Sequence, residues 1–294
     1  MSERIIFGGD KRQIFLAEKL RQQGISVSFA DKKEDFLKKD AVILAPVPFT
    51  KDQTTCFFSP EAAASFTLPA SDQKNPKGHG LCIDEFLSFL SPGQILFGGS
   101  LPENVREFCT SRQILWADYM EMEEVCIQNA VATAEGAVCE AIIHSPLNLQ
   151  KSFCLLGGYG RCGRILAWKL RGMGALVTVL DCDKIKLAQA QADGFSTLCA
   201  KELPIFPNPQ MVQFLFNTIP QPVFDRKFLE KTSDILTVLD LSSAPGGVDM
   251  DYCREKEKTA LLCPGLPGKY SPLTSAEILC KALLSHPEFS KRLS

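Results

Sequence analysis

The 294-residue sequence lacks the features that mark several classes of protein. No apolar run reaches the roughly 18–20 residues that cross a bilayer, so we expect no membrane span. No basic block is present, and 32 Lys and Arg against 34 Asp and Glu leave a net charge of −2, which argues against a nucleic-acid partner. The start, MSERIIFGGD, has no basic segment followed by an apolar stretch, so we expect a cytoplasmic protein.

Metal-binding and redox spacings of cysteine are also missing. The chain has twelve cysteines, yet no pair shows the C-x-x-C spacing typical of zinc clusters and redox dithiols. Several lie inside apolar runs, among them Cys154, Cys263 and Cys280. We therefore expect no metal site and interpret the cysteines as small apolar side chains in a reducing compartment.

Strand-like and helix-like segments alternate along the first 120 residues. The predicted strands are 4–9, 26–31, 41–47, 94–99 and 114–119, and the predicted helices are 11–24, 84–90 and 102–110. Such alternation is typical of a parallel α/β sheet. The polar segment 51–80, rich in Pro and Gly, interrupts the pattern and predicts an irregular loop.

A glycine-rich loop follows the predicted buried strand 152–156. Gly158, Gly160 and Gly163 satisfy the pattern G-x-G-x-x-G. The first glycine permits a tight turn, the second lets the backbone approach a pyrophosphate, and the third allows a helix to pack closely on the strand. A helix and the strand 176–180 follow in the expected order. The sequence therefore predicts that this loop binds a dinucleotide, with Tyr159, Arg161 and Cys162 also in contact.

An acidic residue, Asp181, ends the second strand of this unit. It stands eighteen positions after Gly163, close to the roughly 20 expected for an acid that binds a ribose hydroxyl. A carboxylate here favours the free 2′-hydroxyl of NAD and repels the 2′-phosphate of NADP. The alternative is that Asp181 only caps the next helix, since Asp is a favoured N-cap residue.

Three later strands run into short loops of small residues, Pro and Gly. The predicted strands are 212–217, 235–241 and 259–263. In an open parallel sheet the ligand lies beyond the carboxyl ends of the strands. These loops supply further candidates for cofactor binding, namely Asn217, Thr218, Pro220, Ser242, Gly265 and Pro267.

The chain is thus predicted to be an α/β protein with two Rossmann-like domains, each built on a parallel sheet, with a cleft between them. Residues 1–120 are the predicted N-terminal substrate domain, flavodoxin-like or Rossmann-like. Residues 121–145 form a long connecting helix with a stripe of small and apolar residues. Residues 146–294 form the predicted NAD(P)-binding domain, closed by a C-terminal helix over 271–285.

Several phrases together resemble one family, the A subunit of dipicolinate synthase of spore-forming bacteria. They occur in the family's order over nearly the whole chain, and are GGDKRQ (8–13), EEVCIQNAVATAEGA (123–137), LGGYGRCGRILAWKL (156–170), FNTIP (216–220), DLSSAPGG (240–247) and PGLPGKYSPLTSAEIL (264–279). The resemblance implies two Rossmann-like domains arranged as in the D-2-hydroxyacid and alanine dehydrogenases.

The same resemblance implies an activity and partners. A dihydrodipicolinate-type ring would be oxidised to pyridine-2,6-dicarboxylate, with a nicotinamide cofactor taking the hydride, in the mother-cell compartment during sporulation. A B subunit resembling flavoproteins is implied as partner, and we also expect a homo-oligomer. One departure concerns the cofactor. Family members often carry small and basic residues after the second strand, which suit NADP, whereas this chain has Asp181, Cys182 and Asp183.

Aromatising a dihydropyridine dicarboxylate requires loss of a hydride, loss of a proton to a base, and a hold on two carboxylates. Arg and Lys suit carboxylates, which makes Arg12 and Lys269 candidates for substrate binding. Thr133, in the connecting helix, is a further substrate-binding candidate. Glu135 and Asp10 are the candidate bases, with Lys269 as a third catalytic candidate. The alternative for Glu135 is a structural hydrogen-bonding role.

Two other functions remain open from the sequence. One is an NAD(P)-dependent dehydrogenase that acts on an amino or hydroxy acid, although the catalytic histidine of many hydroxyacid dehydrogenases has no counterpart here. The other is a non-catalytic dinucleotide-binding subunit that needs its partner for chemistry.

Overall fold

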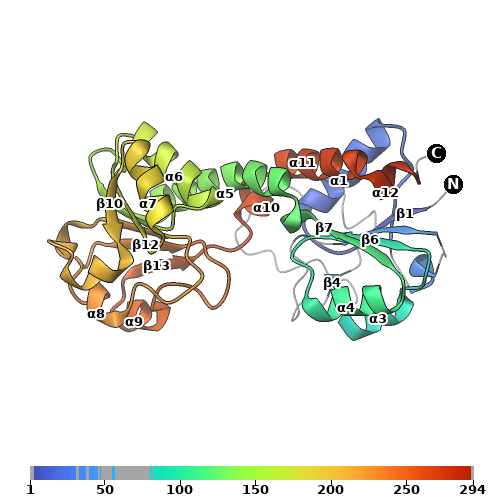
Figure 1. The fold of residues 1–294 in the computed structure, drawn as a ribbon, viewed down its shortest axis with the longest axis horizontal. Helices are drawn as coiled ribbons and strands as arrows, with labels where there is room; N and C mark the ends of the chain where they lie inside the picture. The colour runs from blue at the N-terminus through green and yellow to red at the C-terminus, as the bar shows by residue number, and fades with distance from the viewer. Residues whose placement is uncertain are drawn as a thin grey trace. The chain divides into compact units, whose positions relative to one another are not determined.

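A computed structural model describes residues 3–30, 33–37, 40–45, 47, 55–56, 80–81 and 83–292. They form two compact units (Figure 1). The first unit comprises 1–126 and 271–294, and the second comprises 127–270. The chain therefore crosses between the units twice, at Cys126–Ile127 and at Tyr270–Ser271. Most of segment 51–80, for which we predicted a loop, lies outside the described residues.

The first unit contains a parallel five-stranded sheet in the order β2-β1-β3-β6-β7. These strands are β1 (Arg4–Ile6), β2 (Ser28–Phe29), β3 (Val42–Leu44), β6 (Ile95–Gly98) and β7 (Leu115–Asp118). All five fall within the segments predicted from the sequence, and their order is the flavodoxin-like 2-1-3-4-5 arrangement. A separate antiparallel pair joins β4 (Thr55–Cys56) and β5 (Gly80–Leu81).

Helices cover both faces of this sheet, because alternate residues of each buried strand point to opposite sides. Ile5 and Ile43 pack on one side with α3 (Ile83–Phe89) and α4 (Glu103–Ser111). Ile6 and Val42 pack on the other with α1 (Lys11–Gln22). Two short 3₁₀ segments, η1 (Lys33–Phe36) and η2 (Tyr119–Glu121), complete the described part of this unit.

The C-terminal helices lie in the first unit, not in the second domain where we predicted them. They are α11 (Pro272–Ser285) and α12 (Pro287–Ser290). Buried Leu279 and Leu283 of α11 share a core with Leu16 and Leu20 of α1, beside which α11 runs (Figure 1). The apolar stripe of α11 therefore packs on α1 within the first unit.

The second unit contains a parallel six-stranded sheet in the order β10-β9-β8-β11-β12-β13. The strands are β8 (Phe153–Gly157), β9 (Leu176–Asp181), β10 (Ser196–Cys199), β11 (Phe214–Asn217), β12 (Thr237–Asp240) and β13 (Thr259–Leu262). This is the 3-2-1-4-5-6 order of the Rossmann fold, so the predicted fold class is confirmed. The point where the order reverses lies between β8 and β11.

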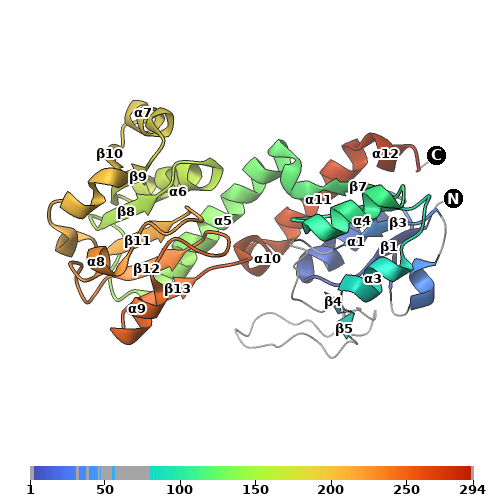
Figure 2. The ribbon, with the colours of Figure 1, turned by 60° about the horizontal axis from the view of Figure 1, so that its bottom comes forward.

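Helices also cover both faces of the second sheet (Figure 2). One side holds α5 (Glu123–His144), α6 (Arg161–Gly172) and α7 (Lys184–Ala192), and the other holds η3 (Ala200–Ile205), α8 (Arg226–Leu229) and α9 (Met250–Glu255). The short turn η4 (Pro209–Met211) precedes β11, and the short helix α10 (Leu266–Tyr270) follows β13, the last strand. In the described part of the chain, no helix is both long and apolar enough to cross a membrane.

The predicted connecting helix exists as α5, yet most of it belongs to the second unit. Ala134, Ala137 and Ala141 lie three and four residues apart and are fully buried in the core of that unit. Small side chains at this spacing let a helix approach a sheet closely. The helix therefore continues from the first unit into the second and forms part of the layer that covers the second sheet.

The assignment of α11 to the first unit can be tested with the two tryptophans, because Trp116 lies in the first unit and Trp168 in the second. We expect Leu283→Ala to destabilise the first unit by roughly 2–5 kcal/mol, as for other buried Leu side chains. Denaturation would be followed by fluorescence in single-tryptophan variants, Trp168→Phe and Trp116→Phe. The transition reported by Trp116 should move to lower denaturant. A shift confined to Trp168 would place α11 with the second unit instead.

Candidate functional site

The start of α6 differs from the starts of several other helices. An Asp side chain caps α1, α7, α8 and α9 by accepting a backbone N–H, and these residues are Asp10, Asp183, Asp225 and Asp249. The N-cap residue of α6 is Gly160, which has no side chain to accept such a bond. The first N–H groups of α6 are therefore directed at whatever lies beyond the helix, and an anion is the favoured partner there.

Each glycine of the loop has its own steric reason. Gly158 has φ +94°, and an added Cβ would lie 2.3 Å from Oγ1 of Thr218. At Gly163 an added Cβ would lie 2.0 Å from the carbonyl oxygen of Gly158, so α6 approaches the turn at backbone distance. At Gly160 it would meet no atom within 4 Å. Two glycines therefore allow the loop to fold, and the third leaves the helix start accessible to a ligand.

Asp181 is buried at the carboxyl end of β9, beside the loop. One carboxylate oxygen accepts the backbone N–H of Tyr159 (2.9 Å), and the other accepts the N–H of Asp183 (3.0 Å). The N-cap of α7 is Asp183, so the alternative that Asp181 caps this helix is wrong. A carboxylate offers about four lone-pair positions, which leaves capacity for a further donor.

The other loop residues have different surroundings. The Tyr159 side chain is buried, and its hydroxyl donates to Asp193 (2.7 Å), so only its backbone faces the loop. Burial raises the pKa of the Cys162 thiol to about 11, and this side chain stays neutral near pH 7. Arg161 is exposed at the first turn of α6.

A buried polar network joins the loops after β11 and β12. Asn217 is fully buried, and its amide donates to the carbonyl of Ile219 (2.9 Å) and to Asp240 (2.8 Å). Asp240, also fully buried, accepts in addition from the backbone and hydroxyl of Ser242 (3.0 and 2.6 Å) and from the N–H of Gly247 (2.9 Å). The side chains of Asn217 and Ser242 therefore shape these loops from within.

The sequence analysis missed Asp240, although a signal for it exists. TVLD occurs at 178–181 and again at 237–240. Asp240 therefore ends a buried strand in the same way as Asp181, and comparison of the two segments would have singled it out.

The remaining cofactor-binding candidates lie in the loops at the carboxyl edge of the sheet. Thr218 donates through its hydroxyl to the carbonyl of Gly157 (2.9 Å) and thereby supports the glycine loop. Pro220 is exposed, Gly265 is exposed with φ +67°, and Pro267 is half-buried in α10. These three contribute backbone shape to the edge of the sheet.

The two candidates of the first unit, Asp10 and Arg12, bind each other. Asp10 caps α1, and the Arg12 guanidinium donates to both of its carboxylate oxygens (2.7–3.0 Å). Arg12 is buried, whereas the Asp10 side chain is 41% exposed. The two residues form a bidentate ion pair at the carboxyl end of β1. If Arg12 binds a substrate carboxylate, it does so while it is already bound to Asp10.

The two candidates on α5 bind other groups of the protein. The Glu135 side chain, a candidate base, is 54% exposed and pairs with Lys169 of α6 (2.8 Å). The Thr133 hydroxyl donates to the carbonyl of Asn129, one turn earlier in the helix (3.1 Å). Exposure of Glu135 supports the structural alternative, in which it links α5 to α6.

Lys269 pairs with a buried carboxylate that the sequence analysis also missed. Its ammonium lies 2.5 Å from Oε1 of Glu140, whose side chain is only 6% exposed. Burial alone would raise the pKa of Glu140, but hydrogen bonds from Lys269 and Tyr270 outweigh it and lower the pKa. Glu140 is therefore ionised near pH 7. A single Glu in the apolar stretch AVCEAII was the available signal.

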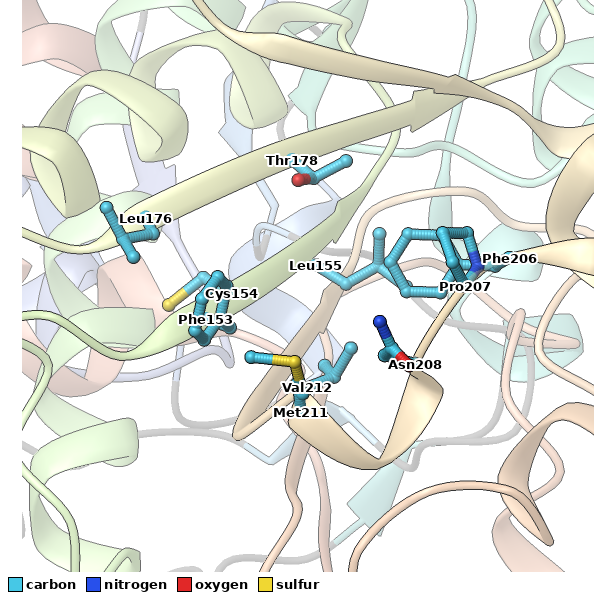
Figure 3. Close-up of a pocket in the computed structure, with 10 residues that line it drawn as sticks. All are labelled: Phe153, Cys154, Leu155, Leu176, Thr178, Phe206, Pro207, Asn208, Met211 and Val212. Atoms are coloured by element: carbon cyan, nitrogen blue, oxygen red, sulfur yellow. The ribbon is translucent and has the colours of Figure 1, made fainter.

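A cavity of about 210 Å³ lies elsewhere in the second unit (Figure 3). It begins at Phe153 and Leu176, the first residues of β8 and β9, and is closed by Met211. The glycine loop leaves β8 at the opposite end. No charged side chain lines the cavity, so it offers none of the groups that a dinucleotide or a dicarboxylate requires.

No group of three or more His, Cys, Asp or Glu side chains is arranged to hold a metal ion, as far as the described residues extend.

Comparison with known proteins agrees with this architecture. No family model matches the chain. It is 26% identical over 281 residues to the dipicolinate synthase A subunit of Bacillus subtilis (strain 168), which covers 95% of this chain and 93% of that protein. Its fold is similar to the crystal structure of the dipicolinate synthase A subunit from Bacillus halodurans (TM-score 0.79, 24% identity, 97% and 98% of the two chains). It is also similar to an L-alanine dehydrogenase (TM-score 0.56, 12% identity, 96% and 88%).

The different surroundings of the loop glycines give a prediction. Gly160→Val should remain folded, since its Cβ meets no neighbour, but should weaken dinucleotide binding about tenfold or more by covering the helix start. Gly163→Ala should weaken dinucleotide binding and should also lower the melting temperature, because its Cβ would collide with the backbone of Gly158. Calorimetric titration and thermal unfolding measure the two effects.

The matched control is Gly172→Ala, at the end of the same helix, where an added Cβ also meets no atom within 4 Å. It should change neither measurement. Unchanged affinity in Gly160→Val would show that the ligand does not approach the start of α6.

Proposed function

We propose, from the similarity of the chain to the A subunit of dipicolinate synthase, that it is an NAD(P)-dependent oxidoreductase that forms dipicolinate. The substrate would be a dihydrodipicolinate-type precursor, oxidised to pyridine-2,6-dicarboxylate in the mother-cell cytoplasm during sporulation. The observation that carries the proposal is the extent of the similarity, which covers 95% of the chain and therefore both units. A shared dinucleotide-binding domain alone would give similarity over the second unit only.

The residues of the second unit fit a dinucleotide. The uncapped start of α6 would receive the pyrophosphate, Gly160 would let it approach the backbone, and Asp181 would accept a ribose hydroxyl. The nicotinamide ring supplies the hydride acceptor when the cofactor is bound. The Asn217–Asp240 network fixes the loops after β11 and β12, which end at the same edge of the sheet.

We propose NAD as the cofactor. The Asp181 carboxylate is buried next to the proposed position of a ribose, and Asp183 adds a second carboxylate nearby. A 2′-phosphate would meet this charge directly. Lys186 offsets part of it, but its ammonium lies 3.9 Å from Asp181 and is 43% exposed, where solvent weakens its effect.

For the substrate we propose Lys269 as a carboxylate-binding residue of the second unit. Its side chain is 52% exposed and belongs to α10, the short helix that follows β13. Arg12 is the candidate of the first unit, with Asp10 beside it as the candidate proton acceptor. Thr133 can contribute a hydroxyl group. Glu135 is not part of this proposal, because it is exposed and bound to Lys169.

A partner is part of the proposal, because the relative is named as one subunit of a synthase, designated A. We propose that the partner is a B subunit of flavoprotein-like fold, and that the chain itself forms a homo-oligomer. Two alternatives can be tested at the same time, a dehydrogenase that acts on an amino or hydroxy acid and a dinucleotide-binding subunit without catalytic activity.

The activity test follows the absorbance of reduced nicotinamide with the purified chain, NAD or NADP, and freshly formed dihydrodipicolinate-type precursor. We expect reduction of the cofactor together with formation of pyridine-2,6-dicarboxylate. Addition of a flavoprotein-like B subunit separates a requirement for the partner from inactivity. Cofactor reduction with alanine or 2-hydroxy acids, but not with the dihydropyridine, would contradict the proposal. Activity of the chain alone would exclude a purely structural subunit.

The preference for NAD is tested at Asp181. Asp181→Ala should reduce the ratio of kcat/KM for NAD over NADP by about tenfold or more, since both attraction to the ribose and repulsion of phosphate are lost. It also removes the bond to the N–H of Tyr159, so the affinity for both cofactors should fall. Asp225→Ala is the control, because it removes the cap of another helix, α8, and leaves both Asp181 and Asp183 in place. An unaltered ratio in Asp181→Ala would assign the acid to loop structure alone.

A further inference from the structure

Glu140 is a buried acid on α5 that binds other side chains. Its carboxylate binds the Lys269 ammonium (2.5 Å), the Tyr270 hydroxyl and Nδ1 of His144 (3.3 Å). Asp118 shows the contrast. It is equally buried and paired with Arg106, but it also accepts the backbone N–H groups of Ser100, Leu101 and Met120. Asp118 thus holds backbone, whereas Glu140 holds other side chains.

Two features of α5 bring α10 within reach of Glu140. Gly136 lies four residues before Glu140, on the same face of the helix. An added Cβ at Gly136 would lie 2.9 Å from Cβ of Leu266 and 2.9 Å from a ring carbon of Tyr270. The missing side chain therefore permits the close approach of α10, and the carboxylate one turn later binds the residues that α10 presents. This contact joins two of the sequence phrases, NAVATAEGA and PGLPGK.

The cost of burial differs between the two members of the Glu140–Lys269 pair. A buried carboxylate is costly unless a cation and hydrogen bonds compensate it, so Glu140 depends on Lys269 and Tyr270. Lys269 has no such need, because its side chain is half exposed. An exposed pair such as Lys169–Glu135 would hold α5 to a neighbour without this cost. A buried acid therefore serves to fix one lysine at a defined place.

The fixed ammonium keeps binding capacity. An ammonium group has three N–H donors, and one of them is directed at Oε1 of Glu140. Among the described residues this is the one hydrogen bond of the ammonium, so two donors stay available, on a half-exposed side chain of α10. A free lysine loses much side-chain entropy when it binds an anion, and an ammonium that is already held loses less.

We propose that Glu140 is a positioning residue that holds the Lys269 ammonium in place to bind a carboxylate group of the substrate. The assignment of the substrate as a pyridine dicarboxylate rests on the proposed function. The competing role for Glu140 is purely structural, as an anchor of α10 on α5.

The test compares full-length variants in calorimetric titrations with pyridine-2,6-dicarboxylate in the presence of reduced cofactor. Lys269→Ala should weaken binding about 10- to 100-fold, as expected for loss of a charge-assisted hydrogen bond. Glu140→Gln should weaken it in the same direction by a smaller factor, about 3- to 10-fold. In turnover, KM for the precursor should rise in both variants while KM for the cofactor stays constant. Glu124→Gln removes an exposed ion pair of the same helix and is the matched control.

The double variant separates positioning from a structural role. If Glu140 acts through Lys269, Glu140→Gln should add nothing once Lys269 is alanine. Gly136→Ala, which leaves both charges in place, should weaken dicarboxylate binding by moving α10. If Glu140→Gln folds poorly, the dicarboxylate affinity of Gly136→Ala tests the proposal in its place.

Several outcomes would overturn the inference. These are unchanged dicarboxylate affinity in Glu140→Gln or Gly136→Ala, additive losses in the double variant, and a wild-type chain that binds no dicarboxylate. Failure of the proposed function looks different. The wild-type chain would bind pyridine-2,6-dicarboxylate through Lys269 and Glu140 but would not oxidise the dihydropyridine.

Discussion

The approach of α6 to the turn after β8 is the contact on which the rest of the second unit's site depends. An added Cβ at Gly163 would lie 2.0 Å from the carbonyl of Gly158, so the two backbones are in direct contact. Because the helix begins this close to the strand, its uncapped N–H groups lie at the carboxyl edge of the sheet. The same turn brings the N–H of Tyr159 to Asp181, and the Thr218 hydroxyl binds Gly157 beside it.

Two identical strand ends perform different tasks around this contact. TVLD ends both β9 and β12, and in each case the Asp is buried. Asp181 accepts two backbone N–H groups and keeps capacity for a ligand. Asp240 binds Asn217, Ser242 and Gly247, and its oxygens are committed to the protein. Position in the sheet, rather than local sequence, decides which acid keeps capacity for a further donor, because β9 adjoins the glycine loop and β12 adjoins β11.

Local rules explain what the sequence could predict. Strand alternation and the glycine pattern act over a few residues, and with them the described strands of both main sheets, apart from β10, and the loop at 158–163 were found. The location of α11 could not be found in this way. Its apolar stripe packs on α1, a helix more than 240 residues earlier in the chain, and no local pattern indicates such a contact. The sequence also left open whether Asp181 caps α7, because Asp181 and Asp183 are equally good cap residues, and the structure assigns the cap to Asp183.

Glutamates of α5 show the same limit at the level of single side chains. Glu135 and Glu140 are five residues apart, so they lie about 140° apart around the helix. The sequence analysis chose Glu135 as a candidate base in the connecting helix, but its side chain is 54% exposed and pairs with Lys169 of α6. Glu140 lies on the face of Gly136, where the helix meets α10, and its charge is stable there only because Lys269 and Tyr270 reach it. A buried acid of this kind can be predicted from the sequence only if its partner is known. The partner of Glu140 is Lys269, which is 129 residues away in the chain.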